Sequence, residues 1–367
     1  MSSFHGISGH APIALWCVPV GELAGVGRHV LDVARQGIPR TRLMVLCPDG
    51  PLSRALSDEG IPVIVDEFGP DAGLLSSIQA LRHAVTTLRP AIIHTHLAYA
   101  DIVAALALVT RWDTKLVSTE HGIAGTAAVY HSSGMSAQVM ETAHHFRSRV
   151  FDALIAVSDA TAQAMRARWN VTKPITVIRN GVDSSDNGES FSAFSTDSRD
   201  GWKILSLSRL SHEKGLEDVL KAFSVVHRDY PEATLTMAGE GPLRGDLERM
   251  CKVLGISESV TFPGFIDAHD ALYSHDVLVQ LSQWENCSYS LLDAMNSPCG
   301  VVATPVGGNS EMLPSHCLVE GSNVLAVSAA IVNQCENPQS RPSLPTQWPS
   351  VSMMCTEIAA VYRECYQ

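Results

Sequence analysis

Short apolar runs alternate with longer amphipathic stretches through the first half of the chain. The stretches between the runs carry apolar residues at helical spacing. This alternation is typical of βαβ units around a parallel sheet, so we expect a Rossmann-like, doubly wound domain over residues 1–183. The runs that we interpret as strands are 12–18, 42–47, 62–65, 91–96, 115–119, 153–158 and 175–179.

A second alternating set follows a polar stretch. Residues 184–201 are rich in Ser, Asp, Asn and Gly, which predicts a linker. We expect a second Rossmann-like domain over 202–334, so that two α/β halves face a central cleft. Its predicted strands are 203–210, 233–239, 260–265, 277–281, 300–305 and 317–319.

The end of the chain, 335–367, differs from both halves. Residues 335–350 contain four Pro and little periodicity, which predicts a strap or loop. Residues 351–366 then follow a helical pattern. Its apolar face is formed by Met354, Ile358, Val361 and Tyr362.

Candidate chemistry begins with a strand-to-helix turn at 284–295, which carries Glu285 and Asp293. In doubly wound sheets, ligands bind beyond the carboxyl ends of the strands. Ser288 is a plausible N-cap for the helix that follows. Free N–H groups at a helix start favour a phosphate or a polarised hydroxyl. The amides concerned are those of Cys287, Ser288, Tyr289 and Ser290. Taken alone, the stretch is better explained as an ordinary surface turn.

Basic and histidine side chains follow other predicted strands. Arg209 and Lys214 lie in the turn 208–215 and would converge on an anion, although an ordinary basic loop is the alternative. His94 and His96 share one face of a strand. Such a pair can bind zinc, but the sequence shows no third ligand, so we interpret both as structural.

Charge and composition narrow the function classes. A net charge of -12 disfavours nucleic acid, because phosphate-backbone binding needs a basic face. Nine Cys without ligand spacing favour reduced cytoplasmic thiols over disulfides or zinc. We expect no signal peptide and no transmembrane helix. Scattered arginines at 35, 40 and 42 offer only weak support for peripheral contact with the inner face of a membrane.

Together these motifs resemble glycosyltransferase family 4, a family of nucleotide-sugar-dependent enzymes with the GT-B fold. Its hallmark is a Glu, seven residues and a second Glu, matched here by Glu285 and Asp293. The resemblance implies that Glu285 holds donor-sugar hydroxyls and that Asp293 holds the ribose. It also implies that Arg209 and Lys214 bind the donor diphosphate, since the family has the same basic pair.

Further motifs in the second half follow the same family pattern. Residues 239–243 resemble its Gly-x-Gly-Pro loop, which contains Gly241 here, and 306–311 resemble its Gly-Gly-x-x-Glu motif. Residues 262–265 resemble the loop that precedes the base-binding groups. The resemblance implies that Phe265 and Ile266 flank the nucleobase, with core packing as the alternative for Phe262 and Phe265.

The first half carries two more matches, which make it the acceptor-side domain by resemblance. Gly25 corresponds to the glycine that approaches the donor diphosphate, whereas Gly27 stands where the family usually has Glu. His121 corresponds to a histidine that binds the donor sugar. A C-terminal helix that returns to the first domain is also expected from the GT-B fold.

We therefore predict a retaining glycosyltransferase that moves a sugar from a nucleotide diphosphate sugar, UDP- ahead of GDP-, to a hydroxyl acceptor. The acceptor is a glycan, a lipid-linked saccharide or a small metabolite. No cofactor and no metal are predicted, because no Asp-x-Asp sequence occurs and Arg209 with Lys214 can neutralise the diphosphate. Two alternatives remain: a GT-B nucleotide-sugar epimerase and a catalytically silent nucleotide-sugar-binding partner.

Overall fold

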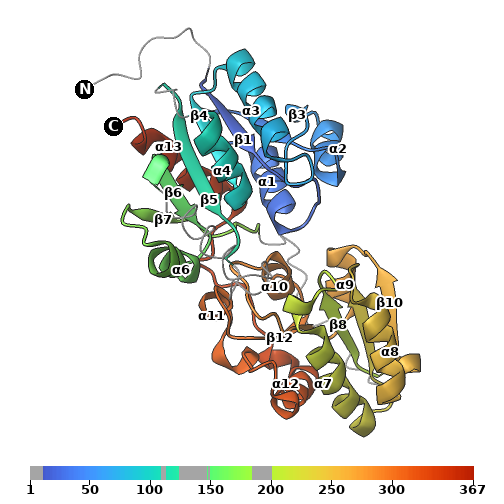
Figure 1. Cartoon of the computed structure of the whole chain (residues 1–367). Helices are drawn as coiled ribbons and strands as arrows, with labels where there is room; N and C mark the ends of the chain where they lie inside the picture. The colour runs from blue at the N-terminus through green and yellow to red at the C-terminus, as the bar shows by residue number, and fades with distance from the viewer. Residues whose placement is uncertain (1–10, 109–112, 124–146, 148, 184–200) are drawn as a thin grey trace. The chain divides into compact units, whose positions relative to one another are not determined.

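The chain folds into two compact units (Figure 1). The computed structural model describes residues 11–108, 113–123, 147, 149–183 and 201–367. Unit 1 comprises Met1–Gly181 and Pro349–Gln367, and unit 2 comprises Val182–Trp348. Each unit is a parallel sheet with helices against both faces, which confirms the predicted α/β architecture.

The sheet of unit 1 has the strand order β3-β2-β1-β4-β5-β6-β7, and neighbouring strands in this order are parallel. Its strands are β1 (Ile13–Cys17), β2 (Arg42–Cys47), β3 (Val63–Val65), β4 (Ile92–His96), β5 (Lys115–Glu120), β6 (Ala153–Ala156) and β7 (Ile175–Val177). Its described helices are α1 (Gly25–Gln36), α2 (Pro51–Asp58), α3 (Leu74–Leu88), α4 (Leu97–Ala107), α6 (Asp159–Trp169) and α13 (Val351–Glu364). The carboxyl ends of all these strands therefore meet at one edge.

Alternation along the strands divides the core of unit 1 into two layers. Leu15 and Cys17 of β1 pack into the layer shared with α3, α4 and α6. Ala14 and Trp16 pack into the layer shared with α1, α2 and α13. Successive strand residues point to opposite faces, so a strand buried on both faces is apolar at nearly every position.

The C-terminal helix α13 packs against α1 in unit 1, as expected for the fold. Ser350 caps it by accepting from the Met353 N–H at 3.1 Å. Its buried face contains the four predicted apolar residues. Helix α13 thus completes the core layer to which β1 contributes Ala14 and Trp16.

Unit 2 contains a smaller sheet with the order β10-β9-β8-β11-β12, again parallel in every pairing. The strands are β8 (Lys203–Leu207), β9 (Thr234–Ala238), β10 (Val260–Gly264), β11 (Val277–Gln280) and β12 (Gly300–Ala303). The helices are α7 (Leu216–Asp229), α8 (Arg244–Leu254), α9 (Ala268–Ser274), α10 (Tyr289–Met295), α11 (Asn309–Met312) and α12 (Val324–Glu336).

One predicted strand of unit 2 is wrong. The segment 317–319 forms a single bridge, between Leu318 and Ala303, instead of a strand. A short 3₁₀ helix, Ser315–Cys317, occupies the residues before the bridge, and a turn leads from Glu320 to the start of α12. Too few residues remain between these turns to extend a ladder.

A buried ion network holds the carboxyl end of β5. Arg147 forms salt bridges to Asp101 and, at 2.6 Å, to Glu120, and all three side chains are almost fully buried. Ser118 also donates to Asp101, at 2.7 Å. Because removal of one partner would leave a buried unpaired charge, this network fixes the strand end from which His121 emerges.

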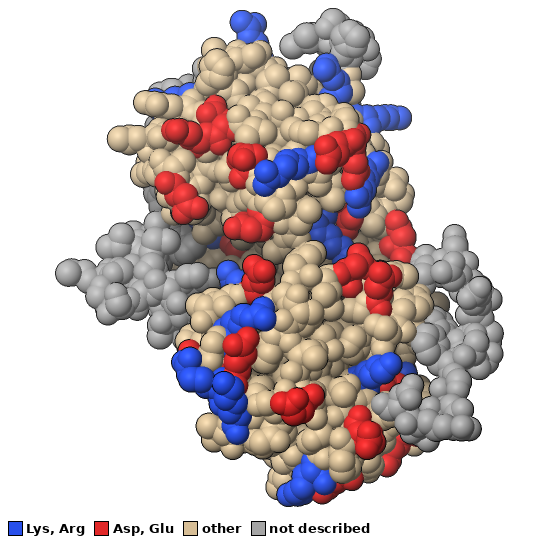
Figure 2. Space-filling model, turned by 90° about the vertical axis from the view of Figure 1, so that its right-hand side faces the viewer, with Lys and Arg blue, Asp and Glu red and all other residues tan. Residues whose placement is uncertain are grey.

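The surface carries charges of both signs. Figure 2 shows Lys and Arg side chains interspersed with Asp and Glu on the face in view. Arg35, one of the three scattered arginines, is paired with Glu59 at 2.5 Å. Within the described part of the chain, no helix combines the length and hydropathy that crossing a membrane requires.

Candidate functional site

The carboxyl edge of the unit 2 sheet gathers most of the predicted site residues. The loop after β8 carries Arg209 and Lys214, the loop after β9 carries Gly241, and the loop after β11 carries Glu285. Parallel strands place these loops along one edge. This is the edge at which doubly wound sheets bind ligands.

Glu285 is held in place by three donors. Its Oε1 accepts from the Gln280 side chain at 2.8 Å, from the Ser282 hydroxyl at 2.9 Å and from the Lys214 ammonium, with which it forms an ion pair. Within the described residues, no hydrogen bond reaches Oε2, the oxygen that remains to accept from a ligand. The carboxylate is therefore oriented before any ligand arrives.

Gln280 links this carboxylate to the start of α10. Its amide nitrogen donates to Glu285, while its Oε1 accepts from the Ser288 hydroxyl at 3.1 Å. Ser288 occupies the N-cap position that the sequence predicts, but its side chain makes no capping bond. The hydroxyl is used for positioning instead.

Glycines let the surrounding loops approach one another closely. Gly307 has a φ of 52°, and a Cβ there would lie 1.6 Å from the Glu285 carbonyl oxygen. Gly215 has a φ of 62°, and its Cβ would lie 2.2 Å from the Leu281 carbonyl oxygen. Neither position admits a side chain, because both the left-handed backbone and the contact exclude one.

Arg209 and Lys214 have different partners. Arg209 donates to Glu213 at 3.0 Å and is largely exposed, while Glu213 also accepts from Ser211 at 2.6 Å. Lys214, in the short 3₁₀ helix His212–Lys214, is mostly buried against Glu285. Their convergence on one anion stays a prediction.

The predicted site residues 287–290 and 293 lie at the start of α10 and in its second turn. Tyr289 and Ser288 are buried, whereas Cys287, Ser290 and Asp293 are partly exposed. Asp293 lies in the second turn of the helix, after the capping residue. The structure thus places both members of the Glu-x7-acid motif in unit 2, at the two ends of one turn.

The predicted base-flanking residues differ in exposure. Phe265 is 83% exposed, so the alternative of core packing is wrong for this ring. Ile266 packs against the core beside α9 and α10. Gly241, with a φ of 158°, approaches the Leu210 backbone, where a Cβ would lie 2.3 Å from the carbonyl oxygen.

In unit 1, Gly25 begins α1, and a Cβ there would meet nothing within 4 Å. Gly27 follows in the first turn, where a Cβ would lie 2.2 Å from the Glu22 carbonyl oxygen. This contact gives the physical reason for glycine at a position where the resembling family carries Glu. A side chain there would force the loop before α1 to move.

His121 lies in a cluster of rings at the carboxyl edge of the unit 1 sheet. The ring of His121 lies 5.1 Å from that of His96 and 4.7 Å from that of His29, measured between centroids. His96 Nδ1 and His121 Nε2 are 2.9 Å apart. Burial lowers the pKa of His29 to about 4, and it lowers the pKa values of His94, His96 and His121 well below 6.5. The rings are therefore neutral at neutral pH.

His94 belongs to a separate chain of hydrogen bonds that includes Tyr362 of α13. The Trp16 indole can only donate, and it donates to the Tyr362 hydroxyl at 2.7 Å, which leaves the hydroxyl proton for the other neighbour of this oxygen, His94. The hydroxyl donates to His94 Nδ1 at 2.7 Å, and His94 Nε2–H then donates to Thr119 at 2.7 Å. Both nitrogens of His94 are thus used structurally, as the sequence suggests.

Sequence reasoning missed the residues that position the candidate groups. Gln280 and Ser282 orient Glu285, and His29 joins the histidine cluster from α1. A glutamine that ends a run of buried apolar strand residues is a signal that could have found Gln280. His29 offers no such signal, because its neighbours in the cluster lie far away in the chain.

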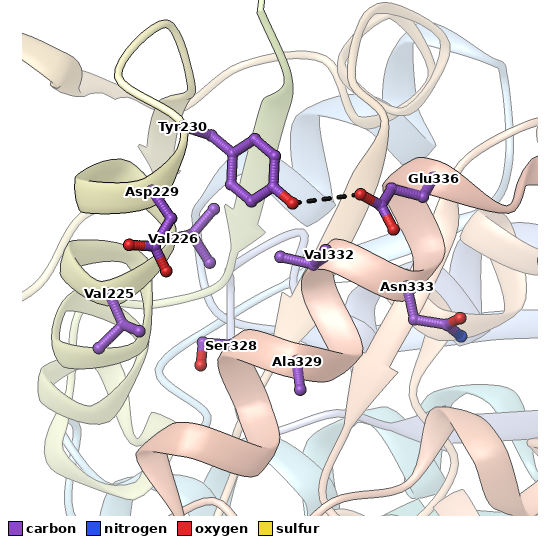
Figure 3. A pocket seen from close by; sticks show the side chains of 9 residues that line it. All are labelled: Val225, Val226, Asp229, Tyr230, Ser328, Ala329, Val332, Asn333 and Glu336. Carbon is purple, nitrogen blue, oxygen red and sulfur yellow. Dashed lines mark hydrogen bonds between the residues drawn. The ribbon is translucent and has the colours of Figure 1, made fainter.

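A groove elsewhere in unit 2 lies outside this edge (Figure 3). It is formed by the C-terminal parts of α7 and α12, where Tyr230 donates to Glu336 at 3.1 Å. Gln334 of α12 accepts from the Val301 N–H near the start of β12. The groove therefore lies toward the amino ends of the strands, away from the ligand edge.

Comparison with known proteins shows which family the chain resembles. The model described as Glycosyltransferase Family 4 matches residues 23–186, and the model described as Glycosyl transferases group 1 matches residues 189–344. The glycogen synthase of Mycobacterium tuberculosis is 27% identical over 330 residues, which are 81% of this chain and 78% of that protein. The chain belongs to the glycosyltransferases.

Solved structures agree with the fold of this glycosyltransferase. The complex of Anabaena Alr3699/HepE with UDP-glucose matches it with a TM-score of 0.72 and 19% identity, covering 97% of this chain and 98% of that one. The sucrose-phosphate synthase of Thermosynechococcus elongatus matches with a TM-score of 0.74 and 19% identity, covering 97% and 99%. The two parallel-sheet units of this glycosyltransferase thus form the GT-B fold.

Proposed function

We propose that this glycosyltransferase is a retaining member of family 4 that transfers a hexose from a nucleotide diphosphate sugar to a hydroxyl acceptor. The main support for this proposal is the orientation of Glu285 at the carboxyl edge of the unit 2 sheet. Its carboxylate is held there by Lys214, Gln280 and Ser282. Its Oε2 is available for donor-sugar hydroxyls, which is the role implied for the first carboxylate of the family motif.

Lys214 supplies positive charge where the leaving group needs it. An ammonium has three donors, so one can stay with Glu285 while the others reach the diphosphate. The nucleotide diphosphate departs as an anion, and fixed cations and N–H groups lower the barrier by stabilising that charge. Arg209 adds a second cation from the same loop, once it exchanges Glu213 for phosphate.

The remaining contacts with the donor are inferred from the resemblance to family 4. Asp293 binds the ribose, Gly241 and Gly25 allow backbone approach to the phosphates, and Phe265 with Ile266 flanks the base. The amides of residues 287–290 assist the diphosphate. UDP is the favoured nucleotide, because the similar Anabaena protein was solved with UDP-glucose. His121 holds the donor sugar, and no cofactor is required.

Replacement of Lys214 by Ala tests this proposal. Glu285 keeps two donors in the variant, so the fold should persist. Turnover should fall about 10²–10³-fold, as expected for loss of one group that stabilises developing charge. The assay is release of nucleotide diphosphate, with water or an added glycoside as acceptor.

The matched control is Lys221→Ala, which removes a lysine that pairs with Asp218 on the exposed side of α7. This variant should retain full turnover. If Lys214→Ala were as active as Lys221→Ala, the assigned role of Lys214 would be wrong.

A further inference from the structure

Three histidines from distant parts of unit 1 meet at one point. His29 comes from α1, His96 ends β4, and His121 follows β5. One ring nitrogen from each lies within 4.8 Å of the other two. From this juxtaposition we propose that unit 1 contains a three-histidine site for a borderline divalent metal ion, with Zn²⁺ as the favoured ion.

The spacing of two of the rings is close to that of ligands on one ion. His96 Nδ1 and His121 Nε2 are 2.9 Å apart. Two nitrogens at Zn–N distances of about 2.0–2.1 Å in tetrahedral geometry are separated by about 3.3 Å. In the metal-free chain these two nitrogens share one hydrogen bond, so one of them carries a proton. Binding of both to a single ion requires that this proton move to the other nitrogen of its ring and that the two rings turn toward a common point.

The third ring presents a lone pair that has no partner. His29 Nδ1 lies 3.2 Å from the Asn180 side-chain oxygen, which can only accept, so Nδ1 carries the proton. Nε2 then carries the lone pair and, like Nε2 of His96, it is buried without a hydrogen-bond partner among the described residues. An unpaired buried acceptor is unfavourable, and a metal ion would satisfy it.

Asn180 acts as the outer partner that metal-binding histidines commonly have. A hydrogen bond to the other ring nitrogen fixes the tautomer and the orientation of the ligand. His29 is also stacked on Trp16, with ring planes 12° apart, so the ring is held before a metal arrives. Neutral imidazoles are the form that binds a metal.

Borderline divalent ions suit this set of ligands. Three imidazoles without a carboxylate or thiolate favour Zn²⁺, Co²⁺ or Ni²⁺ over Mg²⁺ or Ca²⁺, which prefer oxygen. Among the three histidines, only His121 is partly exposed. Three protein ligands also leave a fourth position for a small oxygen ligand. A bound ion would tie α1 to the carboxyl ends of β4 and β5. It would also occupy a nitrogen of His121, so that nitrogen serves either the ion or a donor-sugar hydroxyl, but not both at once.

Titration of the chelator-treated full-length chain with Zn²⁺ alone tests the proposal. We expect one ion per chain by calorimetry, a rise in Tm, and the visible absorption bands of tetrahedral Co²⁺ when Co²⁺ replaces Zn²⁺. The measurement needs no donor or acceptor, so it can fail independently of the glycosyl-transfer proposal.

Variants identify the ligands. His29→Gln should weaken Zn²⁺ binding at least about 100-fold, and Asn180→Ala about 10–100-fold, as expected for a ligand and its outer partner. If His29→Gln does not fold, His121→Gln in the half-buried loop provides the same test. The control is His269→Ala, which removes a histidine from an exposed group with Asp267 and Asp270. It should not change the affinity.

Two results would overturn the proposal. One is no binding of Zn²⁺ by the wild-type chain below millimolar concentration. The other is binding that survives His29→Gln and His121→Gln unchanged or is lost in His269→Ala, since the ion would then be held at the surface.

Discussion

The Tyr362 hydroxyl offers a sharp test of how the C-terminal helix contributes to unit 1. In Tyr362→Phe the ring remains, so almost no volume is lost. The change removes one oxygen that accepts from the Trp16 indole and donates to His94 Nδ1, both at 2.7 Å. Trp16 and His94 are fully buried, so water cannot replace the lost oxygen.

The expected loss of stability follows from the two groups left without a hydrogen-bond partner, the Trp16 N–H and His94 Nδ1. A buried polar group left without its partner costs about 1–3 kcal/mol, and here two are left. We therefore expect the free energy of unfolding to fall by about 2–4 kcal/mol, allowing for some relaxation. His94 cannot escape the penalty by changing its tautomer, because either tautomer leaves Nδ1 without a partner.

Tyr366→Phe provides a matched control in the turn that follows the same helix. Its hydroxyl donates to the Ala91 carbonyl oxygen at 2.5 Å, but that oxygen also accepts from the Lys115 N–H at 3.0 Å. The control should cost less than about 1 kcal/mol, since its partner remains bonded.

Urea unfolding measures both variants. Because the two units can unfold separately, hydrogen exchange of peptides from β1 and α13 should report unit 1 alone. A loss of under 1 kcal/mol in Tyr362→Phe, or an equal loss in both variants, would refute the hydrogen-bond chain.

Three further predictions concern other parts of the molecule. Gly307→Ala should displace the Glu285 backbone and lower the rate of glycosyl transfer at least tenfold. The control Gly255→Ala is also at positive φ but beside open space, so it should lower the free energy of unfolding by about 1–2 kcal/mol and leave the transfer rate unchanged. Equal transfer rates in the two variants would contradict this prediction. Saturating nucleotide should slow alkylation of the partly exposed Cys287, measured by peptide mass spectrometry, and an unchanged rate would contradict the donor site. Arg147→Met should lower the free energy of unfolding by about 3–5 kcal/mol by leaving two carboxylates buried without their cation, and urea unfolding that shows a loss under 1 kcal/mol would contradict this.

Local pattern predicted the strands well, because buried parallel strands are apolar on both faces. The prediction 42–47 coincides with β2, and 277–281 exceeds β11 by one residue. The segment 317–319 failed because a short apolar run carries no information about the turns on either side. The buried face of α13 was predictable for a similar reason. Its apolar residues recur at helical spacing, so they fall on the one side that packs against the core.

The sequence predicted which motifs form the candidate site, but not which side chains contact one another within it. Glu285 could be named from its spacing to Asp293, since that spacing lies within one local turn. Its donor Lys214 lies 71 residues away, and the contact depends on how β8 and β11 pair. The missing third histidine has the same cause, because His29 and His96 meet only after α1 packs on the sheet.

The most direct test of the account is binding of nucleotides and nucleotide sugars to the full-length chain. The panel is UDP, GDP, ADP and their common glucose and N-acetylglucosamine conjugates, measured by thermal shift and calorimetry. A ligand at a hundredfold over its Kd adds about 2.7 kcal/mol to stability. The account predicts a selective rise in Tm with UDP compounds that is lost in Lys214→Ala and kept in Lys221→Ala. No shift with any member of the panel would contradict a donor site built around Glu285.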